Sequence, residues 1–263
     1  MTETVLPPNI GTLRNKSGMS TQRINEFLGM LRRTLKPAPK SIKVIEARAP
    51  RKYKVVRNGI GVLTTRFGKF WQYNFVISDK WRNYSVIVKA DVDIRTFTPI
   101  FNNKKQLTVR IDSGCESGRV FGDLTCDCAE QMQLSLKAIA HIGEGIIVSV
   151  PHQDGRGMGR AFKLATLWSQ DILKINTVEA AALVASSPNF DARTYGGVVA
   201  ILKYFHIPKT CTIRLTTNNS KRAAVFSKNG YAVTEQIPVA VRPNKYTKIH
   251  LQAKSNHFSK NDG

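Results

Sequence analysis

The apolar and polar positions change their pattern once along the chain, near residue 128. Before that point, residues 67–77, 84–92 and 105–111 alternate apolar with polar positions and are rich in Val, Ile, Tyr and Phe, which is typical of β-strands. Residues 78–83 and 101–105 carry Ser, Asp and Asn side chains that favour turns. This part of the chain therefore predicts an antiparallel sheet.

After residue 128, apolar residues recur at helical spacing, and short buried runs separate the helical segments. Alternating helices and strands are typical of an α/β unit. We therefore expect an α+β or α/β fold, in which N-terminal antiparallel strands precede alternating helices and strands. The predicted helices are 129–145, with a stop at Gly143, then 161–176, 191–207 and 219–230; the predicted strands are 146–150, 211–217 and 231–237.

Two basic segments flank this central part. About the first 20 residues show no periodicity, so we expect them to be disordered. Residues 20–35 place their apolar side chains on one stripe, which predicts a helix, and the Pro-containing linker at 36–40 ends it. We divide the chain into a basic extension with one short helix (1–55), a main domain (56–242) and a basic C-terminal tail (243–263).

The charge of the chain indicates a polyanionic partner. The formal net charge is +22, and residues 1–54 hold 12 Lys and Arg against three Glu. Nucleic acid, nucleotide phosphates and an acidic membrane face would all be attracted. We interpret the basic termini as solvated tails; nucleic-acid binding through them is an alternative that we do not favour, because no aromatic residues interleave the charges.

The same composition bears on the compartment. The chain has no run of about 18 uncharged apolar residues, so we expect no membrane span. Its start lacks the pattern of a signal peptide, and four cysteines are too few for a disulfide scaffold. We therefore expect a cytoplasmic protein whose thiols stay reduced.

Three cysteines, Cys115, Cys126 and Cys128, follow a C-x10-C-x-C spacing. Zinc prefers thiolate ligands, and catalytic zinc sites use three protein ligands. If Cys126 and Cys128 lie in a strand, their side chains share one face. Three ordinary buried thiols are the alternative. An iron–sulfur cluster needs four thiolates, and Cys211 is remote in sequence.

Three further segments are candidates for binding. The loop 152–160 has a G-x-G-x-G pattern before a predicted helix, which suits a phosphate but is equally compatible with a flexible turn. Asp191 and Arg193 lie at a predicted helix entry, where Asp191 is either a helix N-cap or a functional group. Residues 215–222 form a strand and a basic polar turn that could hold a base edge or a phosphate.

Taken together, the motifs between about residues 62 and 242 resemble GTP cyclohydrolase II, a zinc enzyme that opens the guanine ring at the entry to riboflavin synthesis. The resemblance is carried by six ordered motifs, among them "GDLTCDC", "HQDGRGMG", "DARTYG" and "RLTTNNSKR". It implies hydrolysis of GTP with release of formate and pyrophosphate, and it implies a homodimer.

The resemblance also implies residue roles. Cys115, Cys126 and Cys128 match the ligands of one zinc ion per subunit, which activates a water molecule. Arg193 matches a proposed nucleophile toward the α-phosphate, although a phosphate clamp is an equal alternative, and Asp191 matches the proton acceptor. Mg²⁺ accompanies the triphosphate. The positions that match GTP contacts are Arg110, Gln131, Asp154, Gly155, Arg156, Thr217 and Arg222.

The chain departs from the family pattern near the proposed site. Leu167 stands where the family has a tyrosine, and leucine cannot donate a proton. Gly114 and Phe162 replace a glutamate and an asparagine, while Asp154 and Arg222 replace a glutamate and a lysine. The alternatives are therefore a homologue that stops at the formamidopyrimidine or uses another purine nucleotide, and a non-catalytic nucleotide- or RNA-binding descendant with structural zinc.

Overall fold

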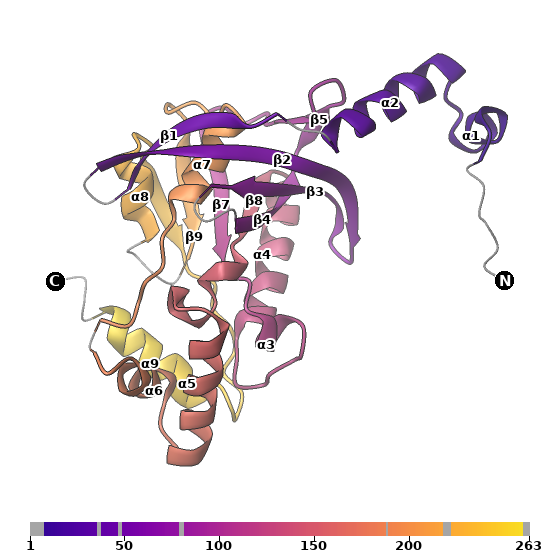
Figure 1. The fold of residues 1–263 in the computed structure, drawn as a ribbon. Coiled ribbons are helices and arrows are strands. Elements are labelled where there is room, and N and C mark those ends of the chain that lie inside the picture. Colours follow the sequence, from indigo (N-terminus) through magenta and orange to yellow (C-terminus); the bar gives the residue numbers. More distant parts are fainter. Residues whose placement is uncertain are drawn as a thin grey trace.

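The computed structural model describes residues 8–35, 38–46, 49–78, 82–187, 189–217 and 222–259. Its centre is a curled eight-stranded sheet with the strand order β1-β2-β3-β4-β8-β7-β9-β10 (Figure 1). The mixed α+β class is as expected. The sheet strands are β1 (Lys40–Glu46), β2 (Ala49–Thr65), β3 (Gly68–Ile77), β4 (Arg82–Lys89), β7 (Gln106–Asp112), β8 (Gly145–Ser149), β9 (Thr212–Thr216) and β10 (Val233–Ile237); β5 (Asp91–Asp93) and β6 (Thr98–Ile100) form a separate pair.

The sheet has an antiparallel part and a parallel part. Strands β1 to β4 pair antiparallel in chain order, as predicted, and β4 also pairs antiparallel with β8. The prediction that residues 105–111 belong to the antiparallel part is wrong, because β7 runs parallel to both β8 and β9. Residues Leu107–Asp112 of β7 are all buried, as is usual for a strand in the middle of a parallel sheet.

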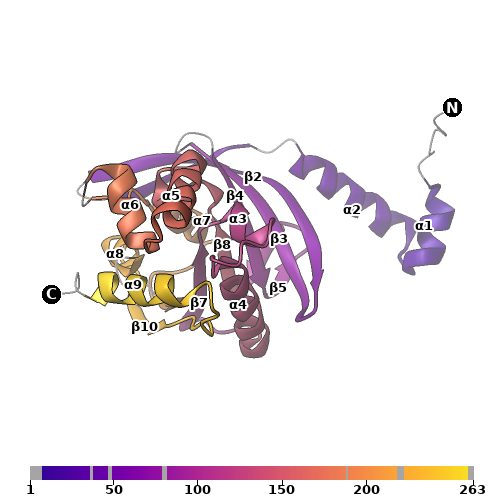
Figure 2. The same cartoon turned by 90° about the horizontal axis from the view of Figure 1, so that it is seen from below.

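Helices cover both faces of the sheet. Val86 and Val88 of β4 belong to a core with α7 and α8, whereas Ile87 packs with Leu136 and Ile139 of α4, so alternate residues face opposite layers. Helices α5, α6 and α9 gather below one end of the sheet, as seen in Figures 1 and 2. These helices are α3 (Glu116–Arg119), α4 (Cys128–Ile142), α5 (Arg160–Leu173), α6 (Thr177–Ala185), α7 (Gly196–Tyr204), α8 (Ala223–Lys228) and α9 (Lys248–Ser259).

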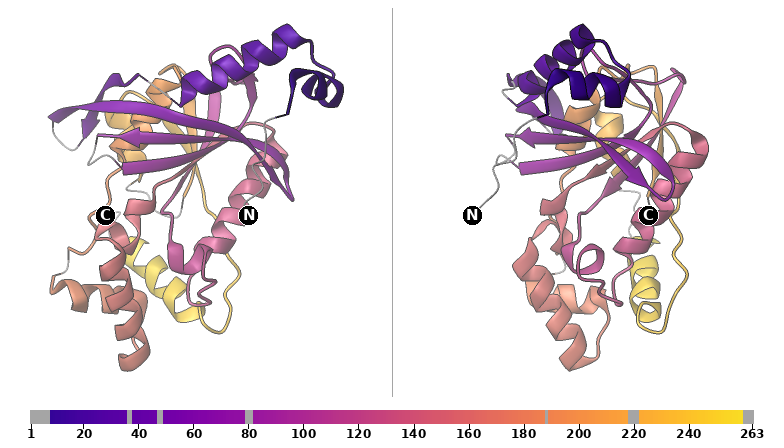
Figure 3. Two further views of the ribbon diagram at one scale, coloured as in Figure 1. Left: turned by 45° about the vertical axis from the view of Figure 1, so that its right-hand side comes forward. Right: turned by 90° about the vertical axis from the view of Figure 1, so that its right-hand side faces the viewer.

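The N-terminal part is more ordered than its composition predicts. Helix α1 (Ile10–Ser17) is capped at both ends. The side chain of the N-cap residue Asn9 accepts a hydrogen bond from the Thr12 N–H, and the C-cap residue Gly18 has the left-handed conformation. Helix α2 (Thr21–Thr34) follows the cap residue Ser20, as expected. Both helices project from the body of the protein (Figure 3). None of the described helices is long and apolar enough to cross a bilayer.

Two predicted helices begin later than expected. The segment predicted as a helix from residue 191 is irregular up to Tyr195, and α7 begins at Gly196. Helix α8 begins at Ala223, while residues 218–221 lie outside the described residues. The predicted C-terminal tail contains helix α9, which packs against α6.

Candidate active site

Three thiols meet where β7 ends. Cys115 follows β7, Cys126 lies in the segment between α3 and α4, and Cys128 is the first residue of α4. The sulfur atoms of Cys115 and Cys126 are 3.5 Å apart, and all three sulfurs lie within 4.8 Å of one another. The expectation of a shared strand for Cys126 and Cys128 is wrong, because an irregular segment and the start of a helix bring their side chains together instead.

The space around the thiols suits a metal ion. A tetrahedral zinc ion bound at about 2.3 Å holds its sulfur ligands about 3.8 Å apart. A Cβ atom at Gly118 would lie 2.6 Å from the Cys126 sulfur, so only glycine leaves room for that thiol. All four cysteines of the chain are free thiols. The donor set and its surroundings therefore fit zinc.

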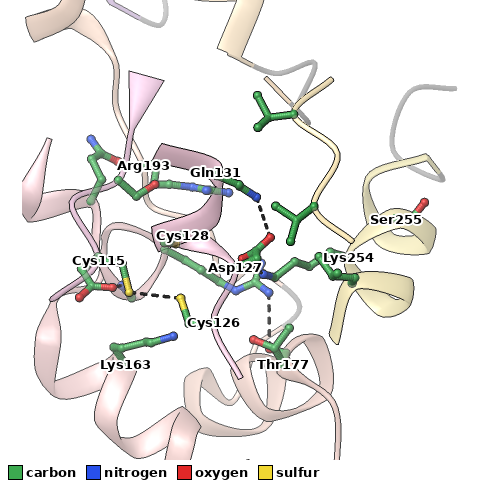
Figure 4. A pocket seen from close by; sticks show the side chains of 18 of the residues that line it. Cys115, Cys126, Asp127, Cys128, Gln131, Lys163, Thr177, Arg193, Lys254 and Ser255 are labelled. Atoms are coloured by element: carbon green, nitrogen blue, oxygen red, sulfur yellow. Dashed lines mark hydrogen bonds and ion pairs between the residues drawn. The ribbon is translucent and has the colours of Figure 1, made fainter. Parts of the chain in front are cut away.

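The electrostatics of the cluster favour a thiolate. Hydrogen bonds from the thiols of Cys115 and Cys128 hold the pKa of Cys126 far below its ordinary value, in spite of burial. Burial by itself lowers the pKa of Lys163, but the negative charge of the cysteines outweighs burial and raises that pKa. Figure 4 shows the Lys163 amino group close to Cys126. A thiolate beside a cation is the state in which cysteine binds metal.

The Gly-rich loop forms two short 3-10 turns between β8 and α5, η1 (Pro151–Gln153) and η2 (Gly155–Gly157). The Asp154 side chain accepts hydrogen bonds from the N–H groups of Gly155, at 2.8 Å, and Glu116, at 3.4 Å. Asp154 thus joins the loop to the first turn of α3, next to Cys115. This carboxylate has a structural task as well as the substrate contact predicted for it.

The same loop also positions Arg193. The carbonyl of Arg156 accepts a hydrogen bond from the Ala192 N–H at 2.9 Å. A Cβ atom at Gly157, whose φ is +81°, would lie 2.7 Å from the Arg193 backbone nitrogen. A side chain at this position would therefore push the two segments apart, and the Gly-rich pattern serves close packing here.

Asp191 and Arg193 form a bidentate ion pair. Arg193 Nε donates to Asp191 Oδ1 at 2.8 Å, and Arg193 Nη2 donates to Asp191 Oδ2. Asp191 is not a helix N-cap, because α7 begins five residues later at Gly196. Burial opposes both charges, yet the hydrogen bonds between the two side chains lower the pKa of Asp191 and raise that of Arg193. Arg193 is therefore a firmly protonated cation.

Two buried arginines, Arg110 and Arg222, lie on another side of the same site. Arg110 Nη1 donates to the Thr216 carbonyl at 3.1 Å and Nη2 to Gln131 Oε1 at 2.6 Å, and Arg222 Nη1 donates to the Ile111 carbonyl at 2.8 Å. The Nε atoms of both arginines are buried and have no hydrogen-bond partner among the described residues. Burial, then the charge of Arg222, lowers the pKa of Arg110 to about 10. Among the described residues, neither guanidinium group makes a direct ion pair with a carboxylate, although the charges of Asp112 and Asp127 act on Arg110 from a distance.

These groups surround one cavity of about 650 Å³. Of the predicted site residues, two do not line it. Asp191 pairs with the lining residue Arg193, and Thr217 is buried beside β10, where its N–H donates to the Ile237 carbonyl at 3.0 Å. The predicted residues that line it are Arg110, Cys115, Cys126, Cys128, Gln131, Asp154, Gly155, Arg156, Arg193 and Arg222.

The structure adds lining residues that sequence reasoning missed. Lys163 follows Phe162 in the first turn of α5 and faces the cavity, as does Thr166, while Leu167 is half-buried and is not among the lining residues. Asp127 also lines the cavity, but its place between two predicted metal ligands gave no separate indication of a role. Lys254 of α9 could not be linked to the cavity from the sequence, because its partner Asp127 lies 127 positions earlier in the chain.

The sequence of the chain matches a known protein family and its members. The family model described as GTP cyclohydrolase II matches residues 60–238. The chain is similar to a protein named GTP cyclohydrolase-2 from Picrophilus torridus, with 34% identity over 73% of this chain and 91% of the relative. It is 32% identical to a GTP cyclohydrolase-2 from Campylobacter hominis, over 76% of this chain and 92% of the relative. The riboflavin biosynthesis protein RibBA of Endomicrobium trichonymphae is 30% identical over 73% of this chain, which spans only 44% of that longer relative.

Proposed function

The chain belongs to the GTP cyclohydrolase II family and is a hydrolase acting on GTP, and from that premise we propose a zinc-dependent reaction that opens the imidazole ring of guanine. Formate and pyrophosphate are released, and the product is a diaminopyrimidine ribosyl phosphate of riboflavin biosynthesis. One observation carries the proposal: three thiols and several buried guanidinium groups share a single cavity. That cavity suits both a metal ion and a polyphosphate.

Cys115, Cys126 and Cys128 are the proposed ligands of one zinc ion per subunit. Zinc held in this way activates water as a nucleophile at neutral pH. Gly118 keeps the space for the Cys126 sulfur, and Lys163 offsets the negative charge of the thiolates. The need for three reduced thiols also supports the cytoplasm as the compartment.

Asp191 and Arg193 are the proposed catalytic pair at the phosphate end. Two roles for Arg193 were open, a nucleophile and a phosphate clamp. The raised pKa of Arg193 supports the clamp, because a protonated guanidinium is a poor nucleophile and a good partner for phosphate oxygens. The lowered pKa of Asp191 keeps its carboxylate ionised, which the proposed role as proton acceptor requires, although it also makes the carboxylate a weaker base.

The remaining polar residues are the proposed GTP contacts. Arg156 and Arg222 add positive charge to the cavity, and a Mg²⁺ ion enters with the triphosphate. Burial, and then the charge of Arg193, lowers the pKa of Arg156 to about 10, which an anionic ligand between them would relieve. The proposed contacts that line the cavity are Arg110, Gln131, Asp154, Gly155, Arg156 and Arg222. Thr217 remains a prediction from the resemblance, because it does not line the cavity.

Product analysis tests the reaction. With GTP, we expect the guanine absorbance to fall, and mass spectrometry to find a deformylated diaminopyrimidine together with one formate per GTP. A chelator removes the metal and stops turnover, and added zinc restores it. A product that keeps its formyl group would favour the formamidopyrimidine alternative. No turnover, combined with salt-dependent oligonucleotide binding, would favour the non-catalytic one.

We also propose a homodimer, with one face of α5 as the contact. Leu164, Trp168 and Ile172 lie four residues apart on that helix and are 55%, 73% and 63% exposed. A row of large uncharged side chains on one helix face suits a surface that a second copy covers.

Sedimentation equilibrium tests this surface. Trp168→Asp is expected to convert the dimer to a monomer, because a carboxylate would have to be buried in an apolar contact. Ile94→Asp is the matched control, since Ile94 is 56% exposed and lies near β5, away from α5. A Trp168→Asp protein that sediments as the unmodified dimer would rule out this face.

A further inference from the structure

The last helix of the chain contributes to the cavity from outside the region that defines the family. The family match ends at residue 238, whereas α9 begins at Lys248. Leu251, Lys254 and Ser255 of α9 line the cavity. Figure 4 shows Lys254 reaching toward Asp127, on the opposite side of the cavity from Lys163.

Helix α9 is fixed in this place by polar contacts. The backbone N–H of Thr177, the first residue of α6, donates to His250 Nδ1 at 3.2 Å. Just before α9, the Asn244 side chain accepts hydrogen bonds from the N–H groups of Tyr246, at 2.7 Å, and Thr247, at 2.8 Å. The helix is therefore held by α6 and by the turn that precedes it.

Lys254 begins a chain of charged and polar contacts. Its Nζ lies 2.9 Å from Asp127 Oδ1, and Asp127 Oδ2 accepts a hydrogen bond from Gln131 Nε2 at 2.6 Å. Gln131 Oε1 in turn accepts from Arg110 Nη2 at 2.6 Å. The amide of Gln131 is thus oriented from both ends, with its NH2 group toward Asp127 and its oxygen toward Arg110.

The contact with Lys254 also balances charge. The Asp127 side chain is 4% exposed, so water contributes little to its solvation. A carboxylate beside a cavity for an anionic ligand repels that ligand unless a cation neutralises it. Among the described residues, Lys254 forms the ion pair with Asp127.

We propose that Lys254 is a positioning residue for the nucleotide. Lys254 neutralises Asp127 and thereby fixes the amide of Gln131 and the guanidinium of Arg110. The inference rests on the proposed function, because the nucleotide it serves is GTP. It assigns a role in substrate binding to a helix that lies outside the family match and that sequence analysis interpreted as a solvated tail.

Kinetics of matched variants test the proposal. In zinc-loaded protein, Lys254→Met is expected to raise the KM for GTP about 10-fold while kcat changes less than about 3-fold. The negative charge of Asp127 is then no longer neutralised and repels the nucleotide, whereas the reacting groups stay in place. Lys254→Arg restores KM to within about 3-fold, since the contact to Asp127 needs one donor. Lys248→Met is the control: it makes the same change on the same helix at an exposed position.

A readout without nucleotide separates this inference from the proposed function. The side-chain amide resonances of Gln131 are expected to shift in Lys254→Met and to stay in place in Lys248→Met. If they shift while the unmodified protein neither binds nor hydrolyses GTP, the contact chain stands, and the proposed function and the nucleotide role fail. If they do not shift, or if Lys254→Met has an unchanged KM, the positioning role is overturned. A lowered kcat with lost zinc would also overturn it, because Lys254 would then support the metal cluster.

Discussion

Cys126→Ser is expected to remove zinc from the purified protein and to lower GTP turnover by three orders of magnitude or more. Cys126 is the thiol whose pKa is held lowest, by hydrogen bonds from its two neighbours, so it is the thiolate at the centre of the cluster. A serine hydroxyl stays protonated at neutral pH and is a poor zinc ligand. Without the metal, water keeps a pKa near that of bulk solvent, which accounts for a loss of about 1,000-fold or more. Elemental analysis and product formation measure the two effects.

Cys211→Ser is the matched control for this change. Cys211 is buried, whereas Cys126 is partly buried; Cys211 lies next to β9, and its sulfur contacts the Thr212 carbonyl at 3.7 Å. Zinc content and turnover should both match the unmodified protein. Full zinc and full activity in Cys126→Ser would contradict the assignment of the cluster as the catalytic metal site.

Arg193→Met is expected to lower kcat by about 100- to 1,000-fold, the usual effect of removing one preorganised donor from a developing charge. Zinc should stay bound, because the side-chain hydrogen bonds of Arg193 go to Asp191, which is not a proposed metal ligand. Stability should fall only slightly, since the Asp191 side chain is 29% exposed and water can solvate the carboxylate left behind. Steady-state kinetics with GTP, together with zinc analysis and a thermal melt, measure these three quantities.

Arg214→Met provides the comparison for Arg193→Met. Arg214 forms an ion pair with Glu235 at 2.6 Å, in the neighbouring strands β9 and β10, and neither residue lines the cavity. Loss of that pair should leave kcat unchanged. A kcat for Arg193→Met within about 3-fold of the unmodified protein would show that Arg193 is neither clamp nor nucleophile.

Periodicity predicted most of the regular structure because most of it is amphipathic. Helices α4 and α5 follow the 3.6-residue spacing of their apolar residues, and β3 and β4 follow the alternation of a half-buried strand. The spacing is silent about partners. The spacing of apolar residues could not show that β7 pairs with β8 and β9. Both partner strands come later in the chain, and β7 is buried because it lies between them.

The N-terminal segment shows a second limit. Residues 10–17 lack an apolar stripe, so periodicity gave no reason to expect α1. The helix depends instead on the Asn9 cap and on Gly18 at its end, which are local signals. At the other end of the chain, the contact of Lys254 with Asp127 follows from the fold alone, since no local pattern relates two residues so far apart.

One departure from the family pattern has a structural reason. Gly114, at the position where the resemblance implies a glutamate, has a φ of +63°, and a Cβ atom there would lie 2.5 Å from the Pro151 Cα. A glutamate therefore requires a different path of the chain before Cys115. Glycine at position 114 therefore removes a carboxylate and also permits the close backbone packing against Pro151.

The buried arginines of the cavity have a practical consequence for anyone who handles the protein. The guanidinium groups of Arg110 and Arg222, whose Nε atoms have no hydrogen-bond partner among the described residues, attract any small oxyanion and not only the nucleotide. Phosphate or sulfate in a buffer is therefore expected to compete for the positions proposed for GTP, and an affinity measured in such a buffer describes displacement of one anion by another. A buffer of weakly coordinating ions gives the affinity of the nucleotide itself.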